Sequence, residues 1–481
     1  MRQLALAVVI LLSGCAAAAD DRPNFVVMVA DDLGYGDLGS YGHPDIRTPN
    51  IDRLAAEGLR YTNGYAAAPV CSPARTGLLT GRIPSRVGIY DWIPPGSDVH
   101  LPVVETTVAE LLQEAGYQTV YLGKWHLNGG LGTDQPQPDD HGFDHWYATT
   151  GFAMPTHLDP FNFVRNGVEM GPLEGYACRL LSDEAIHWLS ELRDPDRPFL
   201  MVIGYHEPHE AIASPPELTA SYPATQNRNE AEYFANVTNL DLAVGTVVAA
   251  LDKLGLDDGT MVLFTSDNGP EMVNRHPQAQ RSYGSAGELR GRKLQLWEGG
   301  IRIPFVVRWP GHTDPGDVSE TPVSGVDLLP TLCELAGVAL PNGVELDGTS
   351  ISPTFGGEAI NRSTPLVWHH YKAWGGPRMV LRDGRFKLAG YWDGPEIVRT
   401  DSSTMRPGPR ADPDRRARSI RALRPRCGPR RAARCVRPPP GGRRSDDGRD
   451  ARDLRRNPGR CPPVERELAA AVVRRRMPDA G

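Results

Sequence analysis

Residues 24–30 read NFVVMVA and are followed directly by two carboxylates, Asp31 and Asp32. A continuous apolar run of this length is typical of a strand whose two faces are both buried in a largely parallel sheet. The run therefore predicts a central strand, and it puts two acidic side chains at that strand's carboxyl end.

Outward from this strand, the pattern alternates between strands and helices. Further strands are predicted at 118–122, 199–204 and 261–265, and helices at 48–59, 106–115 and 230–254. Thr48 or Asn50 is expected to cap the first of these helices. The alternation predicts an α/β fold, a large mixed, mostly parallel sheet with helices on both faces. Short strand-like pieces predict a small C-terminal antiparallel subdomain at 366–369, 379–382 and 385–388.

Polar clusters follow four of the predicted strands: Asp31–Asp32, Lys124–His126, His206–His209 and Asp267–Asn268. Because ligands bind outside the carboxyl ends of the strands in such sheets, these clusters are expected to meet at one rim. Adjacent carboxylates repel, so their burial requires a cation, and hard oxygen ligands suit calcium or magnesium better than zinc. Taken alone, each cluster is also common in a solvated turn.

Residues 71–82 read CSPARTGLLTGR and are the most informative segment of the chain. They resemble the signature of the sulfatase family, a CxPxR core followed by an LxTGR-like continuation. For CxPxR alone, the alternative is a buried cysteine at a loop-to-helix transition, with Pro73 and Arg75 structural. The resemblance extends over about residues 22–388. Within the alkaline phosphatase superfamily, the sequence is similar to the formylglycine-dependent, arylsulfatase-like members. It implies an alkaline-phosphatase-like fold.

The resemblance implies a sulfuric ester hydrolase whose nucleophile is Cys71 oxidised to formylglycine. The hydrated aldehyde carries two hydroxyls, of which one attacks sulfur and the other later loses its proton and expels sulfate as the carbonyl re-forms. By resemblance, Arg75 and Lys124 are expected to hold this diol in position. His126 is expected to take the proton that the second hydroxyl loses. His209 is expected to contact sulfate and to protonate the leaving alcohol.

The resemblance also implies the remaining site residues. Lys293, ahead of WEGGIRIP at 297–304, matches the last sulfate-binding cation, and several cations are needed because negative charge shifts during transfer. His206 is an additional candidate for substrate binding, beside Arg75 and Lys293. The implied metal is calcium, with magnesium as the alternative, and its expected ligands are Asp31, Asp32, Cys71, Asp267 and Asn268. Further candidates for the substrate pocket are Trp146, His157, Arg165, Tyr283 and Trp374.

The N-terminus resembles an export signal, since Arg2 is followed by an apolar run at 4–12 and by small residues. That run is too short to span a bilayer, and no later stretch is expected to span one. The segment LSGC ending at Cys15 resembles a bacterial lipobox, which implies cleavage before Cys15 and a lipid anchor to the membrane. Ordinary cleavage within 16–19 is the alternative. We therefore expect an exported protein, which is periplasmic, extracellular or a cell-surface lipoprotein.

Cysteine usage gives no sign of a disulfide framework. Of the seven cysteines, Cys15 belongs to the signal and three lie beyond residue 400. Cys71, Cys178 and Cys333 remain in the body of the chain, and one of these is the expected nucleophile.

Residues 401–481 differ in charge from the rest of the chain. They carry 23 arginines, no lysine and 10 acidic side chains; since the whole chain has 52 basic and 59 acidic residues, the first 400 residues carry 29 and 49. Such asymmetry is typical of a nucleic-acid or membrane tail. The segment has no aromatic residue and little hydrophobic periodicity, so it predicts disorder rather than a packed core.

Arginine without lysine is also what a GC-rich gene yields when it is read out of frame. With suitably chosen codons, residues 421–429 read one base later yield Glu-Leu-Tyr-Asp-Leu-Asp-Ala-Asp, which resembles an ELYDL segment near the end of many sulfatases. We therefore favour a frameshift between about residues 390 and 421 over a basic arm. No nucleic-acid partner is expected.

The sequence thus divides into a signal at 1–19, a catalytic domain at 22–350, a partial C-terminal subdomain at 351–400 and the tail at 401–481. The predicted function is the release of sulfate from a sulfated carbohydrate or an aryl sulfate, after a formylglycine-generating enzyme has modified Cys71. Two alternatives stay open. One is a phosphoester or phosphonate ester hydrolase with the same nucleophile, and the other is a non-catalytic binder or a defective product.

Overall fold

The apolar run at 24–30 forms strand β1 (Asn24–Ala30), which lies inside a ten-stranded sheet with six of its seven residues buried. The structure is a computed structural model that describes residues 21–273, 283–340, 343 and 345–391. The predicted signal with Cys15, and the tail at 401–481, lie outside the described residues.

The large sheet is mixed and mostly parallel, as predicted, and the structure adds that antiparallel pairs lie toward both edges. Its strand order is β11-β2-β10-β9-β1-β8-β4-β5-β6-β7. The central strands β9, β1, β8, β4 and β5 run parallel, whereas β10 joins β9 and β6 joins β5 in antiparallel fashion. The bounds are β2 (Leu59–Tyr61), β4 (Gln118–Lys124), β5 (His145–Thr149), β6 (Val164–Arg165), β7 (Val168–Glu169), β8 (Phe199–Gly204), β9 (Thr260–Ser266), β10 (Phe305–Arg308) and β11 (Asp317–Ser319).

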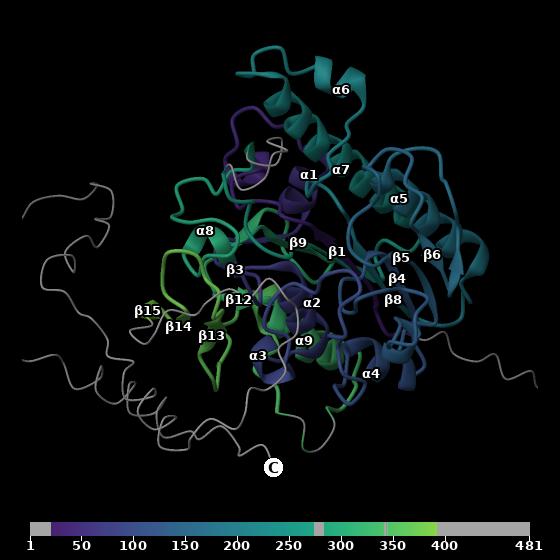
Figure 1. Ribbon diagram of the computed structural model, residues 1–481. Helices are drawn as coiled ribbons and strands as arrows, with labels where there is room; N and C mark the ends of the chain where they lie inside the picture. Colours follow the sequence, from purple (N-terminus) through teal and green to yellow (C-terminus); the bar gives the residue numbers. More distant parts are fainter. Residues whose placement is uncertain (1–20, 274–282, 341–342, 344, 392–481) are drawn as a thin grey trace, which may run out of the picture. The chain divides into compact units, whose positions relative to one another are not determined.

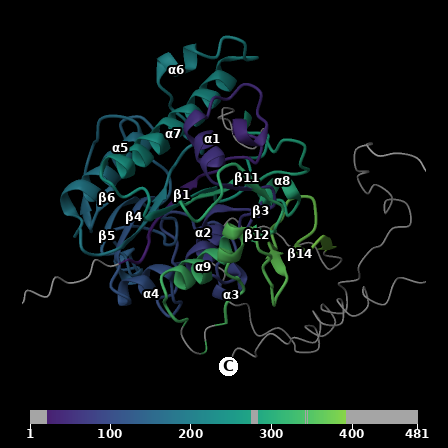
Figure 2. The same cartoon turned by 180° about the vertical axis from the view of Figure 1, so that it is seen from behind.

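Helices cover both faces of this sheet (Figures 1 and 2). Since successive side chains of a strand point to opposite faces, Val26 and Met28 of β1 join one hydrophobic core, and Phe25 and Val27 join the other. The first core is closed by α1 (Pro49–Glu57), α5 (Ala177–His187) and α7 (Arg228–Lys253). The second core is closed by α2 (Cys71–Thr80), α3 (Pro84–Val87), α4 (Val108–Glu114) and α9 (Leu328–Leu335). Two further short helices are α6 (Pro216–Ala220) and α8 (Glu298–Ile301).

The predicted strands and helices are present, with small shifts at their ends. The strand predicted at 199–204 coincides with β8, and β9 extends the predicted strand by one residue at each end. β4 continues two residues beyond the predicted end at 122, so that Lys124 is itself a strand residue. The first predicted helix ends earlier than expected, at Glu57, because Leu59 already begins β2.

The predicted capping of α1 was wrong. The side chain of Thr48, the residue before the helix, makes no capping hydrogen bond. Instead, Oδ1 of Asp241, in α7, accepts from the backbone N–H groups of Asn50 and Ile51 at 3.0 and 2.8 Å. The cap is therefore supplied by a residue about 190 positions away, which no local pattern could indicate.

One helix departs from the expectation that no later stretch could span a membrane. Among the described residues, α7 alone is long and apolar enough to pass that test by length and composition. However, 78% of its most apolar window is buried inside the fold, where it packs against α1 and α5. Its apolar character is thus explained by its place in the first core.

The predicted C-terminal antiparallel sheet is confirmed. It consists of β13 (Leu366–His369), β14 (Met379–Asp383) and β15 (Phe386–Gly390) in that order. Trp368 fastens it to the body of the fold, because its ring packs 5.0 Å from that of Tyr65 and its Nε1 donates to the carbonyl oxygen of Ala66 at 2.7 Å. Tyr65 belongs to a separate two-stranded sheet of β3 (Gly64–Tyr65) and β12 (Val323–Ser324).

Candidate active site

The four polar clusters follow strands that are neighbours in the sheet. β9, β1, β8 and β4 are adjacent and parallel, so their carboxyl ends lie at one rim. Asp31 follows β1, His206 follows β8 by two residues, Asp267 follows β9, and Lys124 ends β4. All four side chains are buried. The structure therefore places them where the strand pattern predicted.

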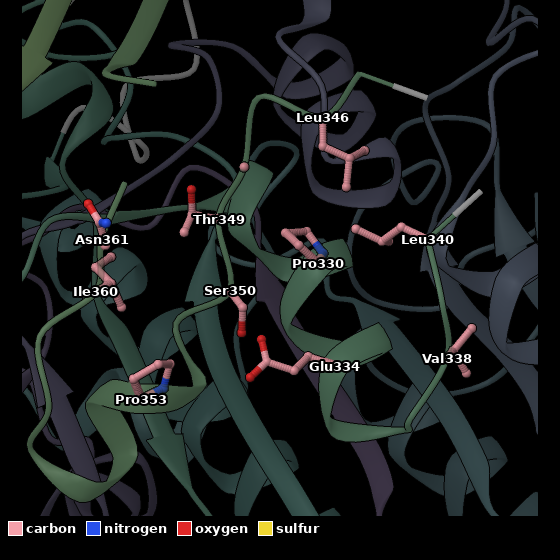
Figure 3. A pocket seen from close by; sticks show the side chains of 11 residues that line it. Pro330, Glu334, Val338, Leu340, Leu346, Thr349, Ser350, Pro353, Ile360 and Asn361 are labelled. Atoms are coloured by element: carbon pink, nitrogen blue, oxygen red, sulfur yellow. The ribbon is translucent and has the colours of Figure 1, made fainter. Parts of the chain in front are cut away.

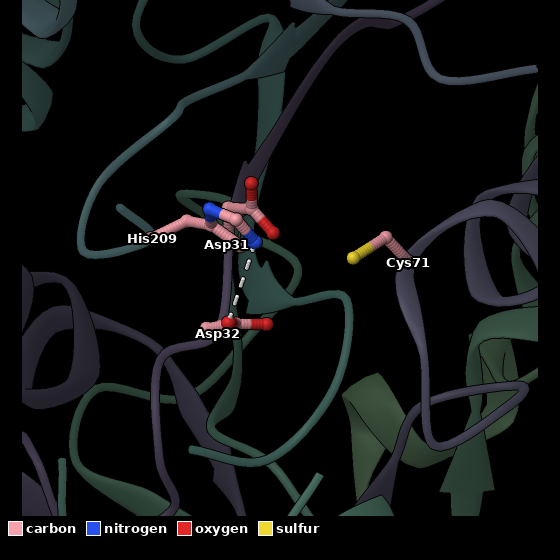
Figure 4. Close-up of side chains that lie close together, drawn as sticks. All are labelled: Asp31, Asp32, Cys71 and His209. Atoms are coloured by element: carbon pink, nitrogen blue, oxygen red, sulfur yellow. Dashed lines mark ion pairs between the residues drawn. The ribbon is translucent and has the colours of Figure 1, made fainter. Parts of the chain in front are cut away.

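Cys71 reaches this rim from the other direction, as the first residue of α2. The preceding residue, Val70, is extended, and Pro73 falls in the first helical turn, where a missing N–H breaks no helical hydrogen bond. Figure 4 shows the sulfur of Cys71 turned toward Asp31, Asp32 and His209. The predicted nucleophile thus faces the predicted metal ligands.

Two lysines pair with the two adjacent carboxylates. Nζ of Lys124 donates to Oδ2 of Asp31, and Nζ of Lys293 donates to Oδ1 of Asp32, both at 2.5 Å. Burial alone lowers the pKa of either lysine, but the facing carboxylate more than offsets this and raises both pKa values. Lys293 also lies 3.4 Å from Sγ of Cys71. Both lysines are therefore positively charged beside the nucleophile.

Arg75 links the nucleophile helix to the third carboxylate. Its Nε and Nη2 donate to Oδ2 of Asp267 at 3.1 and 3.0 Å, and its Nη1 donates to the carbonyl oxygen of Lys124 at 2.7 Å. Burial raises the pKa of Asp267 to about 7, and the negative charge of Asp31 adds to this rise, whereas Arg75 opposes it. Three buried cations thus face three buried carboxylates.

The acidic group fits a divalent cation. The structure brings together ligand atoms that all lie within 4.8 Å of one another, from Asp31, Asp32, Cys71 and His209. Oδ1 of Asp31 and Oδ1 of Asn268 are buried and have no hydrogen-bond partner among the described residues. A buried oxygen without a donor is costly, and a bound cation would satisfy both atoms. Oxygen donors of this kind suit calcium or magnesium.

Two of the predicted metal ligands have other partners as well. Asp267 accepts from Arg75 and, through Oδ1, from the backbone N–H of Asp32 at 3.2 Å. Nδ2 of Asn268 donates to Oδ1 of Asp32 at 2.7 Å, which leaves its Oδ1 as the ligand atom. The geometry also groups His209 with the metal ligands, a role that the sequence did not assign to it.

His126 is present in the tautomer that a proton acceptor needs. Its Nε2 lies 3.0 Å from the carbonyl oxygen of Ile93, and since a carbonyl only accepts, Nε2 carries the hydrogen. Its Nδ1 is buried and has no hydrogen-bond partner among the described residues. Burial, and then the positive charge of Lys124, holds the pKa of His126 well below its usual value. The ring is therefore neutral.

The two histidines after β8 lie in different surroundings. Nδ1 of His209 donates to the carbonyl oxygen of Glu210 at 2.9 Å, so that its Nε2 faces Oδ2 of Asp32 at 3.7 Å. His206 is 1% exposed, bonds to Oγ1 of Thr149 at 2.8 Å, and packs edge-on against Phe163. His209 is thus part of the rim, whereas a contact between His206 and substrate stays a prediction.

Backbone strain gathers at the site. Five non-glycine residues among the described ones have positive φ, and three of them belong to the site: Asp32 (66°), His126 (57°) and Leu294 (66°). Such a conformation costs about 1 kcal/mol or more for an L-residue, so the surrounding contacts hold it in place. The positive φ of His126 follows directly on the end of β4 at Lys124, so the chain turns there instead of continuing as an extended strand.

Several residues near the rim were missed by the sequence pattern. The ring of Phe152 stacks on His209 at 5.3 Å, and Nζ of Lys124 lies 5.9 Å from the centre of the same ring. Glu271 lies 4.0 Å from Nζ of Lys293. Phe152 stands in a loop without any motif, but Glu271 follows Asn268 by three residues and could have been considered.

Four of the further pocket candidates have partners within the fold, and a contact between them and substrate stays a prediction. Trp146 lies near the start of β5, away from the carboxyl rim, and His157 is buried and bonds to Asn236. Arg165 pairs with Glu184, and Tyr283 bonds to Asn227. Among these candidates, Trp374 lies at the site, packed against the cluster formed by Val70, Cys71 and Leu294.

A separate hollow of about 600 Å³ lies beside α9 (Figure 3). Its lining includes Pro330 and Glu334 of α9 and Leu346 and Ile360 from the segments that follow. None of the predicted site residues lines it. The hollow is therefore distinct from the rim that carries the chemistry.

Known sulfatases are similar to this chain over most of its length. Arylsulfatase A of Homo sapiens is 39% identical over 376 residues, which cover 72% of this chain and 70% of that protein. Steryl-sulfatase of Rattus norvegicus is 34% identical over 442 residues, covering 75% of each chain. N-acetylgalactosamine-6-sulfatase of Rattus norvegicus is 33% identical over 413 residues, covering 80% of this chain and 75% of that one.

Solved structures show the same architecture. Ps i-CgsB in complex with k-i-k-neocarrahexaose has a TM-score of 0.69 and 31% identity, over 76% of this chain and 84% of that one. Phosphonate monoester hydrolase of Agrobacterium radiobacter has a TM-score of 0.54 and 21% identity, over 77% of this chain and 87% of that one. This likeness shows a shared fold alone.

Family models cover most of the described chain. The model described as "N-sulphoglucosamine sulphohydrolase, C-terminal" matches residues 292–400, a range that includes the small antiparallel sheet. The model described as "Sulfatase" matches residues 23–338, which run from β1 to beyond α9 and include the whole rim. The chain therefore belongs to the sulfatase family, and it is a sulfuric ester hydrolase of the arylsulfatase-like kind.

Proposed function

We propose that this sulfatase releases sulfate from a sulfated carbohydrate or an aryl sulfate, with a formylglycine made from Cys71 and with a divalent metal, calcium rather than magnesium. One observation carries the proposal. Sγ of Cys71 lies in one cluster with the carboxylates of Asp31 and Asp32 and only 3.4 Å from Nζ of Lys293. The nucleophile, metal ligands and an anion-binding cation therefore meet at a single point.

The overall reaction converts a sulfate monoester and water into an alcohol, sulfate and a proton. The hydrated formylglycine supplies a hydroxyl that attacks sulfur and a second hydroxyl through which sulfate is later expelled. Asp31, Asp32, Asp267, Asn268 and residue 71 would hold a divalent metal, whose positive charge would polarise the sulfuryl oxygens and lower the pKa of the attacking hydroxyl. A sulfate ester brings one negative charge, which suits the cationic side of the rim.

The side chains of the chain itself bind, orient and move protons. Lys124, Lys293 and Arg75 hold the sulfuryl oxygens and the diol, where charge develops during transfer. Neutral His126, with Nδ1 able to accept, takes the proton that permits sulfate release. In its doubly protonated form, His209 gives the proton on Nε2 to the oxygen of the leaving alcohol, while Nδ1 keeps its hydrogen bond to the carbonyl oxygen of Glu210.

Replacement of Cys71 tests this proposal directly. We expect Cys71→Ala to abolish sulfate release from 4-nitrophenyl sulfate, in protein coexpressed with a formylglycine-generating enzyme. Peptide mass analysis of the unsubstituted protein should show sulfur replaced by an aldehyde oxygen at position 71. Cys333→Ala, which removes another buried thiol outside the site, is the matched control and should retain turnover. Undiminished turnover by Cys71→Ala would remove the nucleophile from the proposal.

The substrate class and the location rest on different support. The curated relatives are named for aryl, steryl and N-acetylgalactosamine sulfates, and one structural neighbour was solved with a neocarrahexaose. We infer a sulfated saccharide or aryl sulfate on that basis, and side-by-side turnover of matched sulfate and phosphate esters tests the choice.

From the signal at 1–19 we propose export, with a lipid anchor if cleavage falls before Cys15. Radiolabelled palmitate incorporation, with Cys15→Ser as the control, distinguishes the two forms of processing.

A further inference from the structure

Two segments that are distant in sequence meet beside the nucleophile. Residues 90–93 follow α3, and residues 370–374 connect β13 to β14 of the C-terminal sheet. The rings of Tyr90 and Tyr371 pack edge-on at 6.2 Å, and Nζ of Lys372 lies 2.9 Å from Oδ2 of Asp91. The C-terminal sheet thus contributes to the surroundings of the active site, in addition to its contacts with the core.

The first segment is joined to the catalytic residues through Ile93. Its carbonyl oxygen accepts from Nε2 of His126 at 3.0 Å, and its N–H donates to Oγ of Ser72, the neighbour of Cys71, also at 3.0 Å. Trp92, the residue before it, has its ring centre 6.4 Å from that of His126. The position of Trp92 is therefore set by bonds to the site itself.

The second segment is joined to the site through Trp374. The N–H of Trp374 donates to the carbonyl oxygen of Leu294 at 2.9 Å, and its own carbonyl oxygen accepts from Nε2 of Gln295 at 3.0 Å. Leu294 and Gln295 directly follow Lys293, which lies 3.4 Å from Sγ of Cys71. Trp374 is therefore positioned against the same point of the site from the opposite segment.

Both tryptophans pack on one small apolar cluster that contains the nucleophile. Val70, Cys71 and Leu294 form this cluster and are buried, whereas Trp92 and Trp374 are only partly buried against it. The two indoles therefore present aromatic surface between solvent and the reacting atom. Because Asp91 and Lys372 neutralise each other, the segments that carry the indoles offer little net charge there.

We propose that Trp92 and Trp374 form a ring-binding subsite for the alcohol part of the ester. The subsite selects substrates in which the sulfated oxygen belongs to a pyranose or an arene, whose flat apolar faces pack on indole rings. Open-chain sulfates lack such a face. This inference rests on the proposed function, since it specifies what the leaving alcohol contacts while the cations of the rim hold the sulfuryl group.

The test compares ligands with and without a ring, in Trp92→Ala and Trp374→Ala. We expect kcat/KM for 4-nitrophenyl sulfate and for a monosulfated pyranose to fall by about tenfold or more, mainly through KM, as stacked aromatic surface is lost. The inhibition constant of inorganic sulfate, which has no ring, should change by less than about twofold, because the rim cations remain. Trp92→Phe and Trp374→Phe should restore most of the lost kcat/KM.

Phe386→Ala is the matched control, because this aromatic side chain belongs to the same C-terminal sheet but is 61% exposed on β15. It should leave every constant unchanged. A parallel rise in KM and in the inhibition constant of sulfate would overturn the inference, since the tryptophans would then only support the sulfate pocket. Unchanged kcat/KM in both alanine variants would overturn it as well. Failure of the unsubstituted, formylglycine-containing protein to hydrolyse either ester would instead refute the proposed function itself.

Discussion

The charges of the rim balance in pairs, and this balance explains how they can be buried. Lys124 faces Asp31, Lys293 faces Asp32, and Arg75 faces Asp267, each within 3.0 Å. A buried ion pair is tolerated only where each charge has a close partner, and removal of one partner is costly. A divalent cation on the carboxylates would leave the paired cations able to turn to a sulfuryl group. Metal and substrate are therefore expected to bind cooperatively.

Asp31→Asn tests the metal site at the residue scale. When the free calcium concentration is about 100 times the Kd, bound calcium is expected to raise the free energy of unfolding by about 3 kcal/mol. Asp31→Asn should lose most of this increase, because one ligand oxygen becomes an amide and the other no longer carries charge. Thermal denaturation with calcium and with a chelator measures the effect. Asp258→Asn, an exposed carboxylate after α7, is the control, and an equal shift in both variants would contradict the assigned site.

Two glycines determine how closely strands β4 and β8 approach at the rim. Gly123 and Gly204 are register partners, and a Cβ on Gly123 would lie 2.0 Å from the carbonyl oxygen of Gly204. A Cβ on Gly204 would lie 2.7 Å from Nη1 of Arg75. Gly123 also has φ of 92°, which L side chains rarely adopt. The absence of side chains at this pair lets β4 turn into the site and leaves room for the guanidinium.

Gly123→Ala is the corresponding prediction at the element scale. The clash with rigid backbone adds to the strain of positive φ, so we expect a loss of at least about 3 kcal/mol in the free energy of unfolding. Gly255→Ala provides the control, since its φ is 68° but nothing lies within 4 Å of an added Cβ. Its cost should be only the conformational one, about 1 kcal/mol. Urea denaturation compares the two, and equal costs would show that the close approach of the strands is unimportant.

At the scale of the whole molecule, stability depends on two hydrophobic cores that also enclose neutral histidines. His141 is 1% exposed beside Trp125 in the second core, and burial lowers its pKa to about 4. His370, in the segment that reaches the active site, is also 1% exposed, and burial lowers its pKa to about 4. In the unfolded chain such groups accept a proton near pH 6.5. Acid should therefore destabilise the fold as the pH falls below about 6.5.

The variant His141→Gln tests whether acid lowers the free energy of unfolding through the neutral state of His141. Between pH 6.5 and 4 the unfolded state binds more protons than the folded one, so the free energy of unfolding falls as the pH falls. From pH 7 to pH 4.5 we expect the unsubstituted protein to lose about 2 kcal/mol more than His141→Gln. Urea denaturation at the two pH values supplies the comparison. His187→Gln, at an exposed position of α5, should keep the full acid sensitivity. A parallel pH dependence in His141→Gln would show that His141 is not held neutral.

The sequence by itself determined the central architecture and the chemistry of the rim. The apolar run of β1 indicated a doubly buried strand, and the residues after β1, β4, β8 and β9 were predicted to meet because parallel strands all end at one edge. The segment from Cys71 to Arg82 identified the nucleophile through its resemblance to a family signature. These features are local, so a short window of sequence contains the information for each.

Only the tertiary structure decided how these pieces are held together. The cap of α1 comes from Asp241, the turn after β4 gives His126 a positive φ, and Phe152 reaches His209 from a loop without a motif. The meeting of residues 90–93 with 370–374 joins segments about 280 positions apart. Each of these depends on packing between residues that are distant in the chain. Local propensity and hydrophobic period do not encode such contacts, because they report on neighbours in sequence and not on neighbours in space.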